Sequence, residues 1–184
     1  MLSATTKKFT RQEVEQLLAT GFFAGQRFEL IDGNLIEKMG QNPPHAAAIR
    51  RVSKQLRKIF GEDRVQVQLP IDIRSEDTVP EPDVAVLAEL KAEYEQRHPR
   101  GDELVLVVEV ADTSAAFDLS RKAILYAAAD VPEYWVLDLN RRLLSVHRHP
   151  ERAQYRLIER VSPGHAALLE GHSVRVEDLL PSPA

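Results

Sequence analysis

Two carboxylates stand inside apolar segments that look like β-strands, where ionised groups are rare. Asp83 opens the run Asp-Val-Ala-Val-Leu directly after a proline, and Glu109 lies within Leu-Val-Leu-Val-Val-Glu-Val-Ala. Burying an ionised carboxylate is costly unless a cation or several hydrogen-bond donors meet it. Two such groups on neighbouring strands repel each other, and a divalent cation with oxygen ligands is an economical counter-charge. The pattern therefore predicts a divalent-cation site between Asp83 and Glu109.

Each of these carboxylates also has a structural interpretation. Asp83 would then be a strand-start residue that is hydrogen-bonded to the backbone, and Glu109 would form a buried ion pair with one arginine. For Glu109 a functional role is favoured, because a charged group in the middle of a covered strand is unusual outside functional sites.

Lys122 is the third unusual residue, because it stands among apolar residues of the predicted helix Phe117–Ala129. Asp118 precedes it by one turn, so the two side chains share one side of the helix. One interpretation is a simple ion pair between them. The other directs the ammonium towards the carboxylate pair, where it would stabilise charge on a reacting phosphate or water.

Other polar residues carry weaker signals. Glu29 lies in a predicted hairpin, where glutamates are usually solvated, and His45 is interpreted as a structural histidine rather than a base. His147 and His149 share one strand face and are interpreted as surface residues, because two histidines without a third ligand make a poor metal site. GxSxG, P-loop and GxGxxG motifs are absent, so serine hydrolases, nucleoside triphosphatases and dinucleotide enzymes have no support.

Helices and strands alternate irregularly along the chain. Thr10 and Glu13 form a capping-box pattern that begins a short first helix. The predicted later elements are a hairpin of Arg27–Ile31 and Asn34–Lys38 around Asp32-Gly33, a helix at His45–Phe60 ended by Gly61, strands at Val65–Leu69 (continuing through Ile71 and Ile73), Asp83–Leu87 and Leu104–Ala111, the helix Phe117–Ala129, and strands at Tyr134–Leu137, Leu143–His147, Tyr155–Ile158 and Val174–Val176. This order predicts an α/β (α+β) fold with a mixed central sheet, flanking helices and terminal hairpins.

The predicted helix His45–Phe60 has one wholly basic side. Its cationic residues are Arg50, Arg51, Lys54, Arg57 and Lys58. Such a face either tracks a nucleic-acid backbone by displacing counterions or is simply the solvated side of an amphipathic helix.

Composition limits the class of protein. The 184 residues predict one domain, residues 1–184, and the 43% hydrophobic and 28% charged residues with a net charge of −4 exclude intrinsic disorder. The chain has no cysteine, which excludes disulfide frameworks, thiol nucleophiles and cysteine-ligated zinc and fits a reducing compartment. Met1–Lys8 is polar, and the longest apolar runs are far shorter than a membrane span, so we expect a cytoplasmic protein without membrane contact.

Several segments together resemble a known family. They occur in the order Arg27–Leu35, Pro82–Val86, Val107–Val110, the spaced residues Asp118, Lys122 and Tyr126, and Val131–Asp138. This ordered set resembles the Uma-type restriction endonuclease family, a bacterial branch of the PD-(D/E)XK nuclease superfamily. The likeness extends from Phe9 to Tyr155.

The resemblance implies a restriction-endonuclease-like fold in which Asp83 and Glu109 bind magnesium. The superfamily lysine normally follows the acidic residue by two positions, where this chain has Ala111. In this family the lysine has moved to the following helix, which corresponds to Lys122, and Glu29 matches an early glutamate that completes the site.

The sequence therefore predicts a Mg²⁺-dependent endonuclease with Asp83, Glu109, Lys122 and Glu29 in its site and DNA as the expected nucleic acid. A homodimer would suit the cutting of both strands, with Tyr134-Trp135 or the C-terminal hairpins as its interface. The alternative is a non-catalytic binding or regulatory module on a nuclease-derived fold, which Ala111 supports. A glycosidase is disfavoured, because only 6% of the residues are aromatic.

Overall fold

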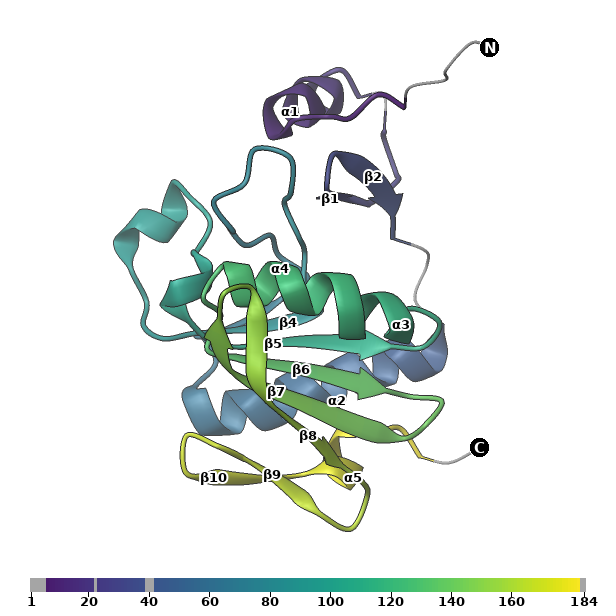
Figure 1. The fold of residues 1–184 in the computed structure, drawn as a ribbon, viewed down its shortest axis with the longest axis vertical. Coiled ribbons are helices and arrows are strands. Elements are labelled where there is room, and N and C mark those ends of the chain that lie inside the picture. Colours follow the sequence, from purple (N-terminus) through teal and green to yellow (C-terminus); the bar gives the residue numbers. More distant parts are fainter. Residues whose placement is uncertain (1–5, 22, 39–41, 183–184) are drawn as a thin grey trace.

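The computed structural model describes residues 6–21, 23–38 and 42–182. Its centre is a six-stranded sheet in the order β3-β4-β5-β6-β7-β8 (Figure 1). The strands are β3 (Val65–Val67), β4 (Val84–Leu87), β5 (Leu104–Ala111), β6 (Glu133–Asp138), β7 (Leu143–Glu151) and β8 (Gln154–Val161). Only β5 and β6 pair in parallel, and each other neighbouring pair is antiparallel. The predicted mixed α/β architecture is confirmed.

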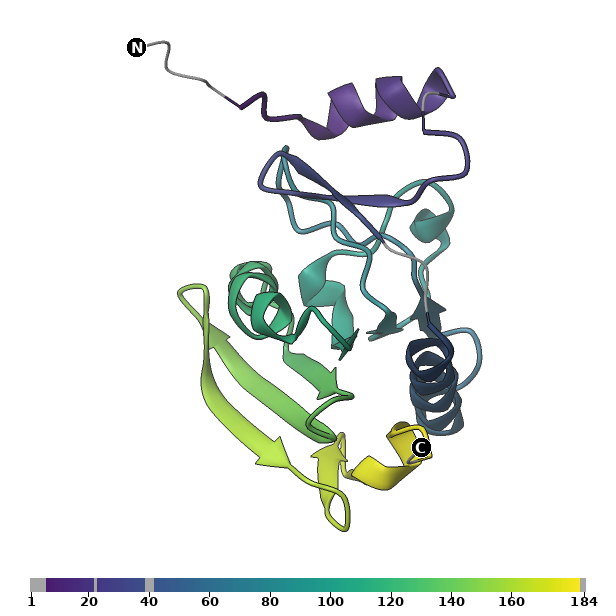
Figure 2. The same cartoon turned by 90° about the vertical axis from the view of Figure 1, so that its right-hand side faces the viewer.

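Helices cover both faces of this sheet, as its edge-on view shows (Figure 2). One face packs against α2 (Pro43–Phe60), α5 (Val176–Leu179) and the hairpin of β9 (Ala166–Leu169) and β10 (His172–Arg175). The other face packs against α4 (Ala123–Ala128). Because β5 is covered on both sides, its residues are almost all apolar, and Glu109 is an exception that must be stabilised locally.

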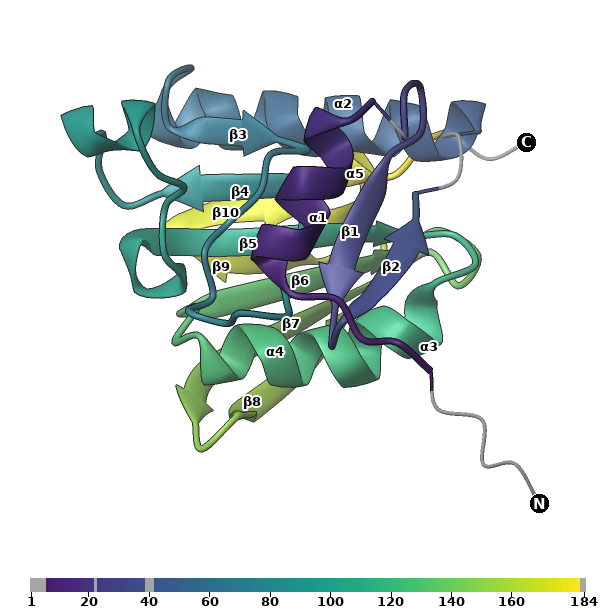
Figure 3. The ribbon, with the colours of Figure 1, turned by 90° about the horizontal axis from the view of Figure 1, so that it is seen from above.

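The N-terminal hairpin, β1 (Phe28–Ile31) and β2 (Asn34–Glu37), lies over the sheet between α2 and α4 (Figure 3). Asp32 and Gly33 both have positive φ, 51° and 72°, as a tight two-residue hairpin turn requires. Helix α1 (Arg11–Ala19) precedes the hairpin and begins with the predicted capping box. The hairpin is also held by the loop below it, through the amide of Val79 at 2.7 Å from the carbonyl oxygen of Leu30.

The predicted helix Phe117–Ala129 consists of three consecutive segments. They are α3 (Ala115–Phe117), a π-helical turn (Asp118–Lys122) and α4. Single π-helical turns are rare and occur frequently at functional sites. Two short 3₁₀ helices, Ala92–Glu95 and Gly101–Glu103, lie in the charged segment between β4 and β5.

Some sequence predictions about elements were wrong. Strand β3 ends at Val67 and does not continue through Ile71 and Ile73, because Gln68 adopts a left-handed conformation with φ 52° that turns the chain. Strand β9 was missed, and the predicted strand Val174–Val176 ends earlier, since Val176 begins α5.

Three residues expected at the surface are buried. Tyr134 and Trp135 are both fully covered, so they form no interface between subunits in this structure. His147 is only 2% exposed, and its ring lies 5.5 Å from that of Tyr134 and 5.7 Å from that of Tyr155. Over the described residues, none of the helices combines the length and the apolar character needed to cross a membrane.

Candidate active site

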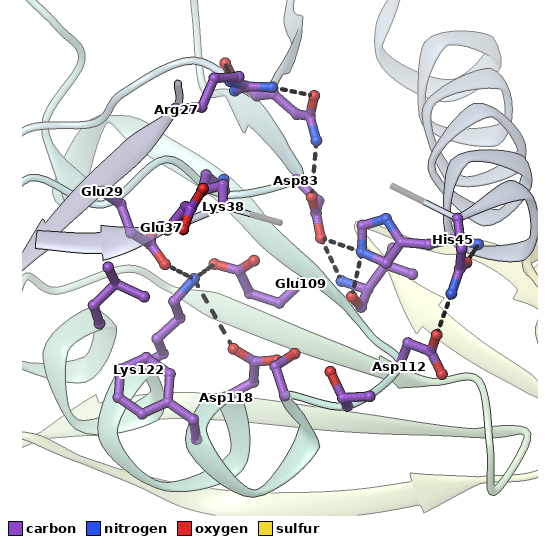
Figure 4. A pocket seen from close by; sticks show the side chains of 17 residues that line it. Arg27, Glu29, Glu37, Lys38, His45, Asp83, Glu109, Asp112, Asp118 and Lys122 are labelled. Atoms are coloured by element: carbon purple, nitrogen blue, oxygen red, sulfur yellow. Dashed lines mark hydrogen bonds and ion pairs between the residues drawn. The ribbon is translucent and has the colours of Figure 1, made fainter. Parts of the chain in front are cut away.

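A cavity of about 660 Å³ lies between the N-terminal hairpin, the first turn of α2 and the end of β5. Its polar lining includes Arg27, Glu29, Lys38, His45, Gln68, Asp83, Glu109, Asp118 and Lys122 (Figure 4). These side chains come from at least five separate segments. The fold therefore gathers groups that are up to 95 positions apart in the sequence, Arg27 and Lys122 being the most distant pair.

The ammonium of Lys122 lies at the centre of a carboxylate cluster. Its Nζ is 2.9 Å from Glu29 Oε1, 3.0 Å from Glu109 Oε1 and 3.9 Å from Asp118 Oδ1. The simple ion pair with Asp118 is thus the longest of the three contacts. The ammonium connects the N-terminal hairpin, β5 and its own helix, and all four groups are at most 5% exposed.

The π-helical turn explains how one helix presents several groups to the same cavity. In an α-helix, four residues exceed one full turn, so side chains spaced by four drift around the axis. The wider π-helical turn between Asp118 and Lys122 offsets this drift. One α-helical turn further on, the hydroxyl of Tyr126 donates a hydrogen bond of 2.7 Å to Glu109 Oε1.

Asp83, which directly precedes β4, is held by several hydrogen-bond donors. Its Oδ2 accepts a 2.9 Å hydrogen bond from the amide of Val110, and its Oδ1 accepts one of 3.2 Å from Gln68 Nε2. His45 Nε2 lies 3.5 Å from Oδ2 and 2.8 Å from the carbonyl oxygen of Val110. Burial raises the pKa of Asp83, but His45, the amide of Val110 and Lys38 together outweigh burial, so the net shift is downward. The same contact with Asp83 raises the pKa of His45.

At Glu109, in contrast to Asp83, the effects that raise the pKa outweigh those that lower it. Burial raises its pKa to about 8, and the negative charges of Asp83, Asp118 and Glu29 add to an effect that Lys122 only partly offsets. Burial also raises the pKa of Asp118. The described lining holds six carboxyl side chains against three lysine or arginine side chains, Arg27, Lys38 and Lys122. An additional cation there would relieve this excess of negative charge.

Comparison with known proteins identifies the family to which this arrangement belongs. Residues 11–182 match the Uma2 family, whose description is "Putative restriction endonuclease". The chain belongs to the Uma2 family. A crystal structure from Anabaena variabilis ATCC 29413, described as "a putative nuclease belonging to DUF820", matches with a TM-score of 0.74 and 14% identity, over 93% of this chain and 97% of that chain. At this identity the likeness shows a shared fold. No curated protein matches the chain.

The cavity of this Uma2 chain has the donor chemistry, but not the complete shell, of a metal site. In the described part of the chain, no three His, Asp or Glu side chains are grouped so that they could hold an ion. Asp83 and Glu109 nevertheless supply carboxylate oxygens, the ligands that Mg²⁺ prefers. Glu29 and Asp118 add further carboxylates to the same cavity. These residues therefore fit a divalent cation whose remaining ligands would be water or substrate oxygens.

The structure brings all four predicted site residues, Glu29, Asp83, Glu109 and Lys122, to this one cavity. Their catalytic and metal-binding roles stay predictions. The structural interpretation of Asp83 also has support, because this carboxylate does accept a backbone hydrogen bond. The expected arginine partner of Glu109 is wrong, since Lys122 and Tyr126 contact it instead.

Sequence reasoning gave too little weight to three other residues of this Uma2 site. His45 was interpreted as structural, yet it lies in the cavity beside Asp83. Tyr126 entered only through the family resemblance and was given no role in the site, and Gln68 was not singled out, although both bind the predicted carboxylates. A signal existed for Tyr126, because it follows Lys122 by four residues. Gln68 had no such signal, since its position depends on the unexpected turn after β3.

Proposed function

We propose that this Uma2 protein hydrolyses phosphodiester bonds of nucleic acid, DNA in the first instance, with the help of a divalent cation. The observation that carries the proposal is the ammonium of Lys122 within 3.0 Å of carboxylates from the N-terminal hairpin and from β5, in the same cavity as Asp83. Membership of a family described as restriction endonucleases and the nuclease fold support it.

Asp83 and Glu109 are the residues that would hold the cation. Asp83 directly precedes β4 and Glu109 lies on the neighbouring strand β5, and the pKa of Asp83 is lowered because His45, the amide of Val110 and Lys38 together outweigh burial. A divalent cation bound there would polarise the phosphoryl oxygen and supply an activated water.

The protein's own side chains position the carboxylates and offset negative charge on the phosphate. Lys122 directs donors to Glu109 and Glu29, which fixes both carboxylates, and its ammonium offsets negative charge that develops on a phosphate. Tyr126 adds a second donor to Glu109 Oε1. Through Nε2, His45 holds the carbonyl oxygen of Val110 beside Asp83. The cavity thus presents a preorganised arrangement that needs little rearrangement during the reaction.

A cleavage assay with matched variants tests the proposal. Asp83→Asn and Lys122→Met should each reduce Mg²⁺- or Mn²⁺-dependent cleavage of oligonucleotides by about 100-fold or more, because each removes several kcal/mol of transition-state stabilisation. Asp138→Asn is the control, since Asp138 is equally buried (4% exposed) but does not line the cavity. Cleavage that persists in both site variants would overturn the proposed site.

The alternative, a non-catalytic binding or regulatory module, is favoured by one observation. Ala111 occupies the usual lysine position and is fully buried, while Lys122 already supplies a positive charge between Glu29 and Glu109. Calorimetric titration with Mn²⁺ distinguishes the two functions. The nuclease predicts binding that Asp83→Asn abolishes, whereas the alternative predicts nucleic-acid retention without metal binding or turnover.

Two coarser expectations belong to the same proposal. If both strands of a nucleic acid are cut, a twofold dimer would place one site on each strand. Its interface would involve exposed apolar side chains of the C-terminal hairpins, which are Leu157, Ile158 and Leu168. Light scattering after gel filtration measures the molar mass of the protein in solution and so distinguishes a dimer from a monomer. A cytoplasmic location fits the cysteine-free sequence and can be checked by fractionation.

A further inference from the structure

The N-terminal hairpin forms a fixed roof over the cavity. Arg121 binds Asp32 at the hairpin turn with Nε 2.5 Å from Oδ2, and Gly33 donates from its amide to the carbonyl oxygen of Asp77 at 2.7 Å. The roof also supplies Glu29, whose carboxylate lies 2.9 Å from Lys122 Nζ. Raising the hairpin would therefore break the carboxylate cluster itself. A substrate must reach the cluster with the roof in place.

The cluster is deep below this roof. Glu29 and Asp83 are 5% exposed, Glu109 and Lys122 are 4% exposed, and Asp118 is 2% exposed. The cavity of about 660 Å³ lies in the range that encloses one small-molecule-sized group, such as a single nucleotide. A duplex presents its phosphates on the outside of a wide, stiff rod, so a flexible unpaired strand can bring one phosphate to the floor of such a cavity more readily than a paired strand can.

The cavity wall has the chemistry that binds an unpaired base. Phe117 and Ile36 line it with apolar surface, and Phe117 is partly exposed. Arg27 lines it as well, with 49% of its side chain exposed. Unstacked bases pack on aromatic rings and on guanidinium planes, which is how proteins bind single-stranded nucleic acids. A duplex keeps its bases stacked inside and offers none of these faces.

We infer that the substrate is a single strand, or a strand unpaired at the point of cleavage, that passes beneath the N-terminal hairpin with one base against Phe117. The inference rests on the proposed function and adds the structural class of the nucleic acid. It assigns Phe117 to substrate binding, a role separate from the carboxylates that act on the phosphate.

Three oligonucleotides of one sequence test the inference by cleavage. They are a single strand, a perfect duplex and a duplex with a central unpaired bubble, each incubated with the wild-type protein and Mn²⁺. The single strand and the bubble should be cut at least about tenfold faster than the perfect duplex. A perfect duplex that is cut as fast as the single strand would overturn the inference and leave the proposed hydrolysis intact. Absence of cleavage in all three would instead contradict the hydrolytic function.

Binding tests the same inference without turnover. Fluorescence anisotropy with the Asp83→Asn protein should show tighter binding of the single strand than of the duplex. Adding Phe117→Leu should weaken single-strand binding by about tenfold, as expected for the loss of one base–aromatic stack, and leave duplex binding unchanged. Phe117→Tyr keeps the ring and should restore the affinity. Equal affinities for the two substrates, or a Phe117→Leu protein that binds the single strand normally, would overturn the inference.

Discussion

Replacing Lys122 by methionine tests the electrostatic arrangement of the cavity without reference to activity. Methionine keeps most of the side-chain length and removes the charge. Glu29, whose carboxylate lies 2.9 Å from the ammonium, is one partner that loses its counter-charge. Both Lys122 and Glu29 are buried, and breaking a buried ion pair by removing one partner costs about 3–5 kcal/mol. We expect a loss of that size in the free energy of unfolding.

Urea and thermal unfolding measure this loss. For a chain of this length each kcal/mol shifts Tm by about 2–4 °C, so the variant should melt roughly 6–20 °C below the wild type. Adding Glu29→Gln to Lys122→Met removes the stranded charge as well and should recover more than half of the loss. The matched control is Lys91→Met, which breaks a 2.9 Å pair with Glu103 at a side chain that is 30% exposed and should change Tm little.

The outcome that refutes this reasoning is a Lys122→Met protein as stable as the Lys91→Met control. It would mean that Glu29 does not depend on the ammonium of Lys122, because water in the cavity or another donor stabilises its side chain. A double variant with Glu29→Gln that is no more stable than Lys122→Met alone would point to the same conclusion. In either case the ammonium would not hold the N-terminal hairpin to β5.

Three further predictions concern other parts of the molecule. His147 is buried and its pKa is lowered to about 4 by that burial, so the wild type should lose about 3 kcal/mol of stability as the pH falls from about 6.5 to about 4, because unfolding then takes up a proton. Unfolding titrations should show this slope vanish in His147→Phe and persist in His149→Asn, whose position is exposed. Gly101→Ala should lower the free energy of unfolding by about 1–3 kcal/mol in urea titrations, because its Cβ would collide with the carbonyl oxygen of Ala129; normal stability would contradict this packing. Thr10→Ala removes the capping box and should speed amide hydrogen exchange in α1 by the equivalent of about 1 kcal/mol, and unchanged exchange would show that the cap is not formed.

The sequence predicted elements best where local pattern and tertiary environment agree. Strand β5 has the predicted ends, Leu104 and Ala111, because an unbroken apolar run has no stable alternative to a doubly covered strand. The hairpin around Asp32-Gly33 is equally local, since the turn alone fixes its register. Helix α2 begins two residues before the predicted His45, because prolines are well accommodated in the first helical turn.

Predictions failed where distant contacts override local preference. The left-handed Gln68 ends β3, and its side chain donates to Asp83, fifteen positions away. His147 looks like an exposed polar residue in an alternating strand, yet the rings of Tyr134 and Tyr155 enclose it. The π-helical turn Asp118–Lys122 has no signature in hydrophobic periodicity, because it shifts the phase within a single turn.

The candidate site shows the same difference between what local sequence pattern determines and what distant contacts determine. Asp83, Glu109 and Lys122 could be selected because each interrupts an apolar pattern, and charge in such surroundings needs compensation. The identity of the compensating groups could not be deduced. Tyr126, for example, suits a buried amphipathic helix equally well with or without a carboxylate partner, and only the fold shows that it donates to Glu109.

The position of the lysine on a helix has a structural cause and a consequence. Ala111 shares the strand face of Glu109 but is fully covered in the cluster of buried side chains that includes Tyr126, so a lysine there would displace packed core. The ammonium of Lys122, which lies on the helix, contacts Glu109 on β5 and also Glu29 on the hairpin. The N-terminal hairpin is thereby part of the site and not an appendage to the sheet. The Uma2 match agrees, since it begins at residue 11 and includes the hairpin together with the central sheet.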